Sequence, residues 1–200
     1  MRRILGHDRV VVRFIGLYAL GLALFFTCWT LSYHLLPEGI LRGVGILGRL
    51  AGESTADTAT QEFTQIFSLN LIGWTLILAC NYVLRVDYFS YGYLVPLAWM
   101  VMYAVTLGTN SFSIPMETRM AVSLSAFQRS GLWEMMAATL FAVTTDSISV
   151  NRSDSLRQAS KPIPKKERLP FKREQWIAVI VSVLILALAA YREAYMIVNI

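Results

Sequence analysis

The chain has 200 residues, of which 56% are hydrophobic and 16% charged, and its formal net charge is +5. Soluble domains are about 45–50% apolar and about 25% charged. This composition excludes an ordinary soluble domain and predicts an all-α, polytopic transmembrane helical bundle. The positive charge does not indicate nucleic-acid binding, because it is concentrated in particular loops of a membrane protein.

Five apolar segments are candidate membrane spans, since a hydrocarbon core of about 30 Å requires about 20 helical residues. The first follows several arginines but is too long for the apolar core of a signal peptide, so we interpret it as an uncleaved anchor. The fourth is the shortest, because only 11 residues between Glu134 and Asp146 are uncharged. The predicted spans are 14–36, 66–84, 92–108, 131–150 and 175–195.

The basic residues decide whether the fourth segment spans. With five spans, 13 of the 18 Lys and Arg residues share one side, in residues 1–13, Arg85 and the 151–174 loop. The opposite loops, 37–65 and 109–133, contain only four arginines. Because basic residues gather on the cytoplasmic side, we predict five spans and a cytoplasmic N-terminus in a prokaryotic plasma or inner membrane.

The two long loops differ in character. The 37–65 loop is predicted to be an outer interfacial segment with an amphipathic helix, because Ile40, Leu41, Val44 and Leu47 recur at helical spacing opposite Arg42 and Arg49. The 151–174 loop is polar, contains three prolines and is predicted to be extended on the cytoplasmic side. Its candidate residues for binding partner proteins or anionic lipids are Lys165, Lys166, Arg168, Lys172 and Arg173.

Neither catalysis nor cofactor binding is indicated. The two histidines, His7 and His34, lie on opposite sides of the first span, so their spacing gives no metal cluster. No G-x-S-x-G motif accompanies His34. A G-x-G-x-x-G match at 43–48 follows a membrane helix rather than a strand, so it does not predict a dinucleotide site. We therefore expect no enzyme activity, no metal and no cofactor.

Polar side chains within the apolar segments form a candidate intramembrane site. Such groups are costly in lipid and usually face the protein interior or an aqueous cavity. They either pair with one another to stabilise the bundle or line a polar chamber or partner-binding surface. The candidates are Asn70, Asn81, Glu134, Arg192 and Glu193, with Asp146 at the end of the fourth segment. We expect Glu134 and Glu193 to share a site with an arginine between them.

Four stretches, taken in order, resemble motifs of the stage II sporulation protein M family of integral membrane proteins. They are Phe67–Leu71 (FSLNL), Tyr103–Asn110 (YAVTLGTN), Arg129–Ala138 (RSGLWEMMAA) and Ala189–Tyr195 (AAYREAY). The third resembles the P-H-G-x-x-E-x-x-A motif and the fourth A-A-x-x-E-A, with Glu134 and Glu193 in register. Arg129 and Ser130 replace the proline and histidine of the third motif, so no metal pair with Glu134 is expected.

The resemblance implies a membrane-embedded scaffold that recruits partners; in spore formers the family assists cell-wall remodelling. We therefore expect a non-enzymatic membrane subunit that binds lipids and other membrane proteins, with no nucleic-acid partner. The alternative is a component of a transporter or channel, with a polar path lined by intramembrane Asn and Glu residues. Five spans make only a small pore, so that alternative would require a homo-oligomer or a partner subunit.

Overall fold

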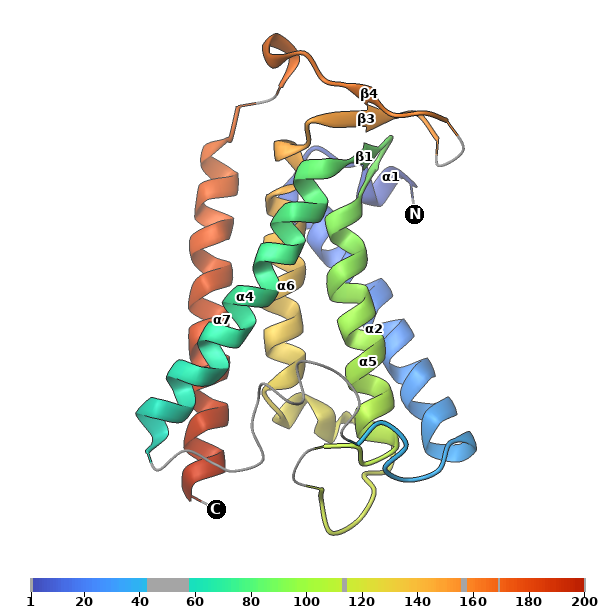
Figure 1. Cartoon of the computed structure of the whole chain (residues 1–200), viewed down its shortest axis with the longest axis vertical. Coiled ribbons are helices and arrows are strands. Elements are labelled where there is room, and N and C mark those ends of the chain that lie inside the picture. The colour runs from blue at the N-terminus through green and yellow to red at the C-terminus, as the bar shows by residue number, and fades with distance from the viewer. Residues whose placement is uncertain (1, 43–57, 113–114, 156–157, 169, 200) are drawn as a thin grey trace.

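The computed structural model describes residues 2–42, 58–112, 115–155, 158–168 and 170–199. The helices, with 3-10 helices marked η, and the strands are α1 Arg2–Leu5, α2 Val10–Leu35, α4 Ala59–Val83, β1 Arg85–Val86, β2 Phe89–Ser90, η1 Tyr91–Tyr93, α5 Leu94–Gly108, η2 Leu124–Gln128, α6 Gly131–Thr144, η3 Asp146–Ile148, β3 Asn151–Ser153, β4 Lys161–Pro162, η4 Lys165–Glu167 and α7 Arg173–Asn199. The long helices α2, α4, α5, α6 and α7 run alternately along one bundle, with the N-terminus at one end and the C-terminus at the other (Figure 1).

Four helices in the described part of the chain are long and apolar enough to cross a membrane. They are Val10–Leu35, Ala59–Val83, Tyr91–Gly108 and Arg173–Val198. Large apolar side chains such as Ile15, Ile72 and Leu188 point outward from them and are exposed. An exposed apolar surface of this kind is stable in lipid and unfavourable in water. The mostly helical architecture with four long apolar helices is therefore compatible with a membrane protein.

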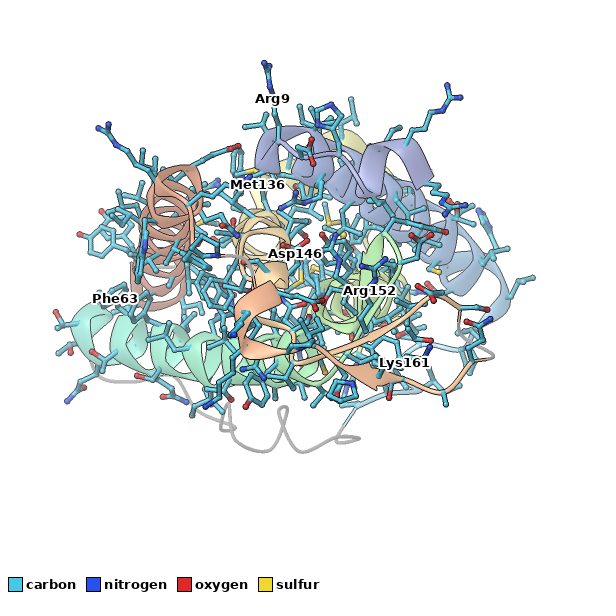
Figure 2. All side chains as sticks on the ribbon, turned by 90° about the horizontal axis from the view of Figure 1, so that it is seen from above. Arg9, Phe63, Met136, Asp146, Arg152 and Lys161 are labelled. Atoms are coloured by element: carbon cyan, nitrogen blue, oxygen red, sulfur yellow. The ribbon has the colours of Figure 1, made fainter. Side chains whose placement is uncertain are left out.

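The fifth long helix, α6, lies in the middle of the bundle and contacts α2, α4, α5 and α7 (Figure 2). Residues 137–146 are all buried. A helix of 14 residues is about 21 Å long, which is shorter than the hydrocarbon core. The four surrounding helices bury residues 137–144 of α6, and this explains why a short segment without a long uncharged run is stable there.

A small four-stranded sheet covers the end of the bundle that carries the N-terminus (Figure 1). The strand order is β2-β1-β3-β4, with β1 and β3 parallel and the two outer pairs antiparallel. The fold is mostly helical, as predicted, and this small sheet is an addition that the sequence did not indicate. The 151–174 loop contributes β3, β4 and η4, so it is a partly folded cap rather than a simple extended segment.

Two helices begin earlier than their hydrophobic runs predict. The first, α2, begins at Val10 rather than at residue 14, because Arg13 is a buried part of the helix. The second, α4, begins at Ala59 rather than at residue 66, with the Thr58 side chain accepting a hydrogen bond from the Gln61 amide at its N-terminus. Residues 59–65 therefore belong to α4 and not to the outer interfacial segment.

The other boundaries follow the same logic. The predicted span 131–150 is helical only to Thr144, and η3 follows it. The predicted spans 92–108 and 175–195 lie within Tyr91–Gly108 and α7. Of the predicted amphipathic helix, Ile40, Leu41 and Arg42 form a turn. Val44, Leu47 and Arg49 lie outside the described residues.

At the end opposite the sheet, one arginine joins the C-termini of two helices. The Arg119 guanidinium donates to the carbonyl oxygens of Ser32, Tyr33 and Leu36 at the end of α2, at 2.8–3.3 Å. It also donates to the Gly108 carbonyl of α5, at 2.6 and 3.0 Å. The last carbonyls of a helix have no partner within the helix and carry partial negative charge. Arg119 therefore fixes α2 and α5 to each other and to the loop that follows α5.

Candidate functional site

The predicted polar residues separate into two sites at opposite ends of the bundle. Asn81 lies near the C-terminus of α4, at the end covered by the sheet. Asn70 is 11 residues earlier in the same helix, about 16 Å away along its axis. Glu134 and Glu193 lie at the end of the bundle where α6 begins and α7 finishes. The four residues do not therefore form one continuous polar row.

The site below the sheet is built around a buried ion pair that the sequence analysis did not identify. Arg13 Nη2 lies 3.4 Å from Asp146 Oδ1, with only 10% and 5% of the two side chains exposed. The Tyr93 hydroxyl donates to Asp146 Oδ2 at 2.8 Å. Arg13 Nη1 also donates to the backbone oxygen of His7 at 2.7 Å. Seen from the sheet end, Asp146 lies near the middle of the bundle (Figure 2).

The same site satisfies the C-terminus of α6. Asn81 Nδ2 donates to the Ala142 oxygen at 2.8 Å, and Arg13 Nη2 donates to the Val143 oxygen at 3.0 Å. Gln175 Nε2 of α7 donates to the Thr144 oxygen at 2.7 Å. Away from water, a helix that ends inside the bundle needs such side-chain donors. The three donors come from α4, α2 and α7, so the site also ties these helices together.

The Asn81 side chain is fully committed to these contacts. Besides Ala142, its amide nitrogen donates to Thr145 Oγ1 at 2.8 Å, and its oxygen accepts from Ser90 Oγ at 2.5 Å. Gly92 packs so closely that a Cβ there would lie 2.1 Å from the Asn81 oxygen. Asn81 therefore has a structural role, and its amide nitrogen has no free donor for a ligand.

The second site, which we call the acid pair, consists of Glu134 on α6 and Glu193 on α7. Small residues allow the two helices to approach each other: Ala138, Ala142, Ala190 and Ala194 are all at most 1% exposed. The two carboxyl groups lie within hydrogen-bonding reach of each other, and the Asn70 side chain is within reach of Glu134. The two acids therefore face each other where α6 and α7 pack together.

Two oxygen atoms at this site are buried without a hydrogen-bond partner in the described structure. One is Glu134 Oε1, on a residue that is 8% exposed. The other is the hydroxyl oxygen of Ser130, which is 4% exposed and precedes Glu134 by one helical turn. Buried polar atoms are almost always hydrogen-bonded, so these two unpartnered oxygens require a specific explanation.

The arginine expected between the two acids is not in ion-pair contact with either of them. Arg129 is close enough to act electrostatically on Glu193. Its Nη1 atom instead lies 3.0 Å from the sulfur of Met116, and its guanidinium carbon lies 5.4 Å from the centre of the Phe112 ring. Arg192 is exposed and donates to the Gln128 backbone oxygen. Arg192 therefore does not belong to the acid pair.

The five candidate partner-binding residues are all exposed at the sheet end of the bundle. They are Lys165, Lys166, Arg168, Lys172 and Arg173. Lys165 and Lys166 lie in η4 and Arg173 begins α7, so the set spans the connection from the sheet to the last helix. Arg9 and Lys161 reach outward at the same end (Figure 2). We call this set of five residues the basic surface.

The four stretches that carry the family resemblance meet at the acid pair. They contribute Asn70, Tyr103, Glu134 and Glu193, and the Tyr103 hydroxyl lies close to Arg129. A Cβ at Gly131 would lie 2.5 Å from the Tyr103 ring, which accounts for a glycine at that position. No family model matches the chain, and the comparisons with curated proteins and with solved structures likewise give no match. The family resemblance therefore stays a prediction from the motifs.

Proposed function

We propose that the chain is a non-enzymatic membrane subunit or scaffold that binds partner proteins through its helices and loops. The membrane is a prokaryotic plasma or inner membrane in this proposal, which follows the family resemblance. The described polar sites support it, because the network around Asn81 and Asp146 is used to hold helices together. Such a hydrogen-bonded network makes the bundle rigid, as a scaffold requires.

The observation that carries the proposal is the basic surface. Its five cations are exposed, and the three ion pairs formed among the described residues do not involve them. Exposed cations without a carboxylate partner contribute little to folding. They favour association with an acidic surface, where complementary charge increases the rate of encounter. We therefore propose an acidic protein surface as the partner of this end.

The proposal includes five membrane crossings with the basic surface on the cytoplasmic side. The alternating directions of α2, α4, α5, α6 and α7 in Figure 1 support this arrangement. The basic surface and the N-terminal arginines lie at one end, as the preference for positive residues in the cytoplasm requires. In this arrangement α6 crosses as a central helix that is screened from lipid by its neighbours.

Replacing all five basic residues with glutamine tests the proposal. We expect the variant to insert into membranes but to recover severalfold less partner in mild detergent. A matched comparison uses two changes of equal charge at the same end: Lys165→Gln/Lys166→Gln against Arg3→Gln/Arg9→Gln. Partner recovery should fall for the first pair and stay near wild type for the second. Sidedness must be measured in parallel, because the loop also directs topology.

Undiminished partner recovery by the five-residue variant would remove the basic surface from the interface. A loss of binding to vesicles that contain anionic lipid, with partner recovery unchanged, would instead assign this surface to lipid headgroups. These two results contradict the proposed protein partner in different ways, so each leads to a distinct interpretation.

A second candidate is a component of a transporter or channel, and the acid pair is the observation that favours it. Ionisable groups inside a membrane protein frequently mark ion pathways. The separation of Asn81 from Asn70, Glu134 and Glu193 reduces the predicted path to one end of the bundle. Ion flux through proteoliposomes containing the purified protein alone would favour this candidate over the subunit.

A further inference from the structure

The acid pair brings two carboxyl groups into contact inside the bundle without a cation between them. Glu134 is 8% exposed, and Glu193 is half-buried on the facing helix. Two adjacent carboxylates repel each other strongly when water is largely excluded, unless a positive charge lies close to both. We propose that Glu134 and Glu193 together bind one exchangeable monovalent cation, a proton or an alkali-metal ion, between α6 and α7.

The charged groups that face the pair leave room for that positive charge. Glu62 of α4 acts on Glu193 and adds negative charge. From α5, Tyr103 presents a neutral hydroxyl. Arg129 is the one nearby cation in the described structure, and it makes no ion pair with either acid. Arg192 of α7 is turned to the Gln128 carbonyl. Glu134 and Glu193 together therefore face one arginine, with Glu62 acting on Glu193 from α4.

The unpartnered oxygens indicate where the cation interacts. Glu134 Oε1 and Ser130 Oγ are both buried without a partner, and they lie on the same face of the start of α6. The Asn70 side chain lies within hydrogen-bonding reach of the same carboxyl and acts on it as a donor. Carboxylate and hydroxyl oxygens are hard ligands, which suit alkali and alkaline-earth ions rather than soft metals. A proton would satisfy the pair by forming a carboxyl–carboxylate hydrogen bond.

The small number of strong ligands favours a monovalent ion. Within the described ranges of the chain, no three His, Cys, Asp or Glu side chains are grouped as a metal site. Divalent cations such as Ca²⁺ take six to eight oxygen ligands and are normally held by several carboxylates. Two carboxyl groups near one arginine instead match a single positive charge.

The position of the pair allows the cation to exchange. Glu134 is in the first turn of α6, and Glu193 is in the final part of α7, at the end of the bundle opposite the sheet. Glu193 is also partly exposed. Water at that end therefore has a short route to the pair. This proposal does not depend on partner binding at the basic surface, which lies at the other end.

The test titrates the full-length purified protein in nanodiscs with protons and with sodium. In the proton arm, infrared difference spectra follow the band of a protonated carboxyl group as the pH is raised. In the sodium arm, Na⁺ replaces choline at constant ionic strength and pH, while proton release and the thermal unfolding temperature are measured. Glu134→Gln and Glu193→Gln remove the site, and Glu167→Gln is the control, because Glu167 is exposed on the sheet side.

If the cation is a proton, the wild type shows a carboxyl band that disappears at high pH and does not respond to Na⁺. If it is sodium, Na⁺ raises the unfolding temperature and releases up to one proton per chain. Either response should be lost in both site variants and retained in Glu167→Gln. A wild-type protein without either response, or with the same response after Glu134→Gln, overturns the proposal and leaves Arg129 as a fixed counter-ion. The titration of the wild-type protein shows whether it binds a proton or Na⁺ at all, even if a variant does not fold.

Discussion

At the residue scale, the Arg13–Asp146 ion pair is stabilised by additional hydrogen bonds to both of its side chains. Tyr93 donates to the carboxylate, and two backbone oxygens before α2 accept from Arg13. A buried ion pair repays the cost of desolvating its charges only when further hydrogen bonds satisfy both partners. Both Asp146 oxygens and both Arg13 Nη atoms have hydrogen-bond partners, and Arg13 Nε has none in the described structure.

Breaking the pair should therefore destabilise the protein strongly. Asp146→Asn leaves the Arg13 charge buried without its counter-ion, and we expect a loss of about 3–5 kcal/mol in unfolding free energy. The double variant Arg13→Met/Asp146→Leu should lose less unfolding free energy than the single variants Arg13→Met and Asp146→Leu lose together. In the double variant, neither charge is left buried without its partner. Denaturation in detergent micelles measures both effects.

The exposed pair Arg152–Asp154 is the control for this prediction. Its side chains are 64% and 72% exposed, and its atoms are 3.8 Å apart. Water screens such a pair, so Asp154→Asn should leave the stability almost unchanged. Equal losses for Asp146→Asn and Asp154→Asn would contradict the assignment of Asp146 to a buried, structural pair.

At the element scale, the stability of α6 depends on other helices, which cover its sides and supply hydrogen-bond donors to its C-terminus. Its apolar surface is covered by four neighbours, and its last carbonyl groups accept from Asn81, Arg13 and Gln175. A short central helix of this kind has little stability by itself, since isolated helices below about 12–15 residues are marginal in water. Its stability comes from the tertiary structure.

Asn81→Leu tests this dependence. The change keeps a similar volume but removes the donor to the Ala142 carbonyl and the acceptor for Ser90. Each buried polar group left without a partner costs about 1–3 kcal/mol, so the unfolding free energy should fall by at least that amount. The substitution should also increase the amide hydrogen-exchange rate more at the C-terminal turn of α6 than in α2.

Asn151→Leu provides the matched comparison. Asn151 also donates through its side-chain amide to a carbonyl at the end of a helix, that of Val83, at 2.8 Å. This contact is exposed, and water can replace the lost donor there. The substitution should therefore have a small effect. A similar loss for both variants would mean that burial of the α6 end is not the source of the Asn81 effect.

At the scale of the whole molecule, the two ends of the bundle differ in charge and in construction. One end carries the N-terminus, the small sheet and the basic surface. The other has the Arg119 contacts to two helix termini and the acid pair. This polarity supports the proposed orientation, with the sheet end in the cytoplasm, because basic residues gather on the cytoplasmic side of membrane proteins.

Cysteine labelling tests the orientation directly. In a background with Cys28 and Cys80 replaced by alanine, Ser160→Cys reports the sheet end and Ser123→Cys the opposite end, and both positions are exposed. We expect a membrane-impermeant maleimide applied to intact cells to label position 123 but not position 160. Labelling of both positions from outside would contradict the arrangement of five crossings, whereas labelling of position 160 alone would indicate an inverted protein.

The sequence by itself determined that the protein is mostly helical with helices long and apolar enough to cross a membrane, because composition and long apolar runs depend on no partner segment. It also predicted one intramembrane polar site of Asn70, Asn81, Glu134, Arg192 and Glu193, since ionisable groups in apolar helices usually face the protein interior. In the structure, Asn81 and Arg192 make other contacts, away from the acid pair. The regular spacing of hydrophobic residues located the long helices, but not their ends. The ends of α2 and α4 depended on Arg13 and Thr58, which are polar and lie outside the apolar runs.

Only the tertiary structure decided the contacts between residues that are far apart in sequence. Arg13 and Asp146 are 133 positions apart. The sequence around each one indicates only a charged residue at the end of an apolar segment. The separation of Asn81 from the acid pair, the sheet made from two loops and the Arg119 contacts to α2 and α5 likewise depend on which helices become neighbours. The local sequence pattern indicates how polar a segment is, whereas the packing of the helices determines which residue becomes the partner of each buried charge.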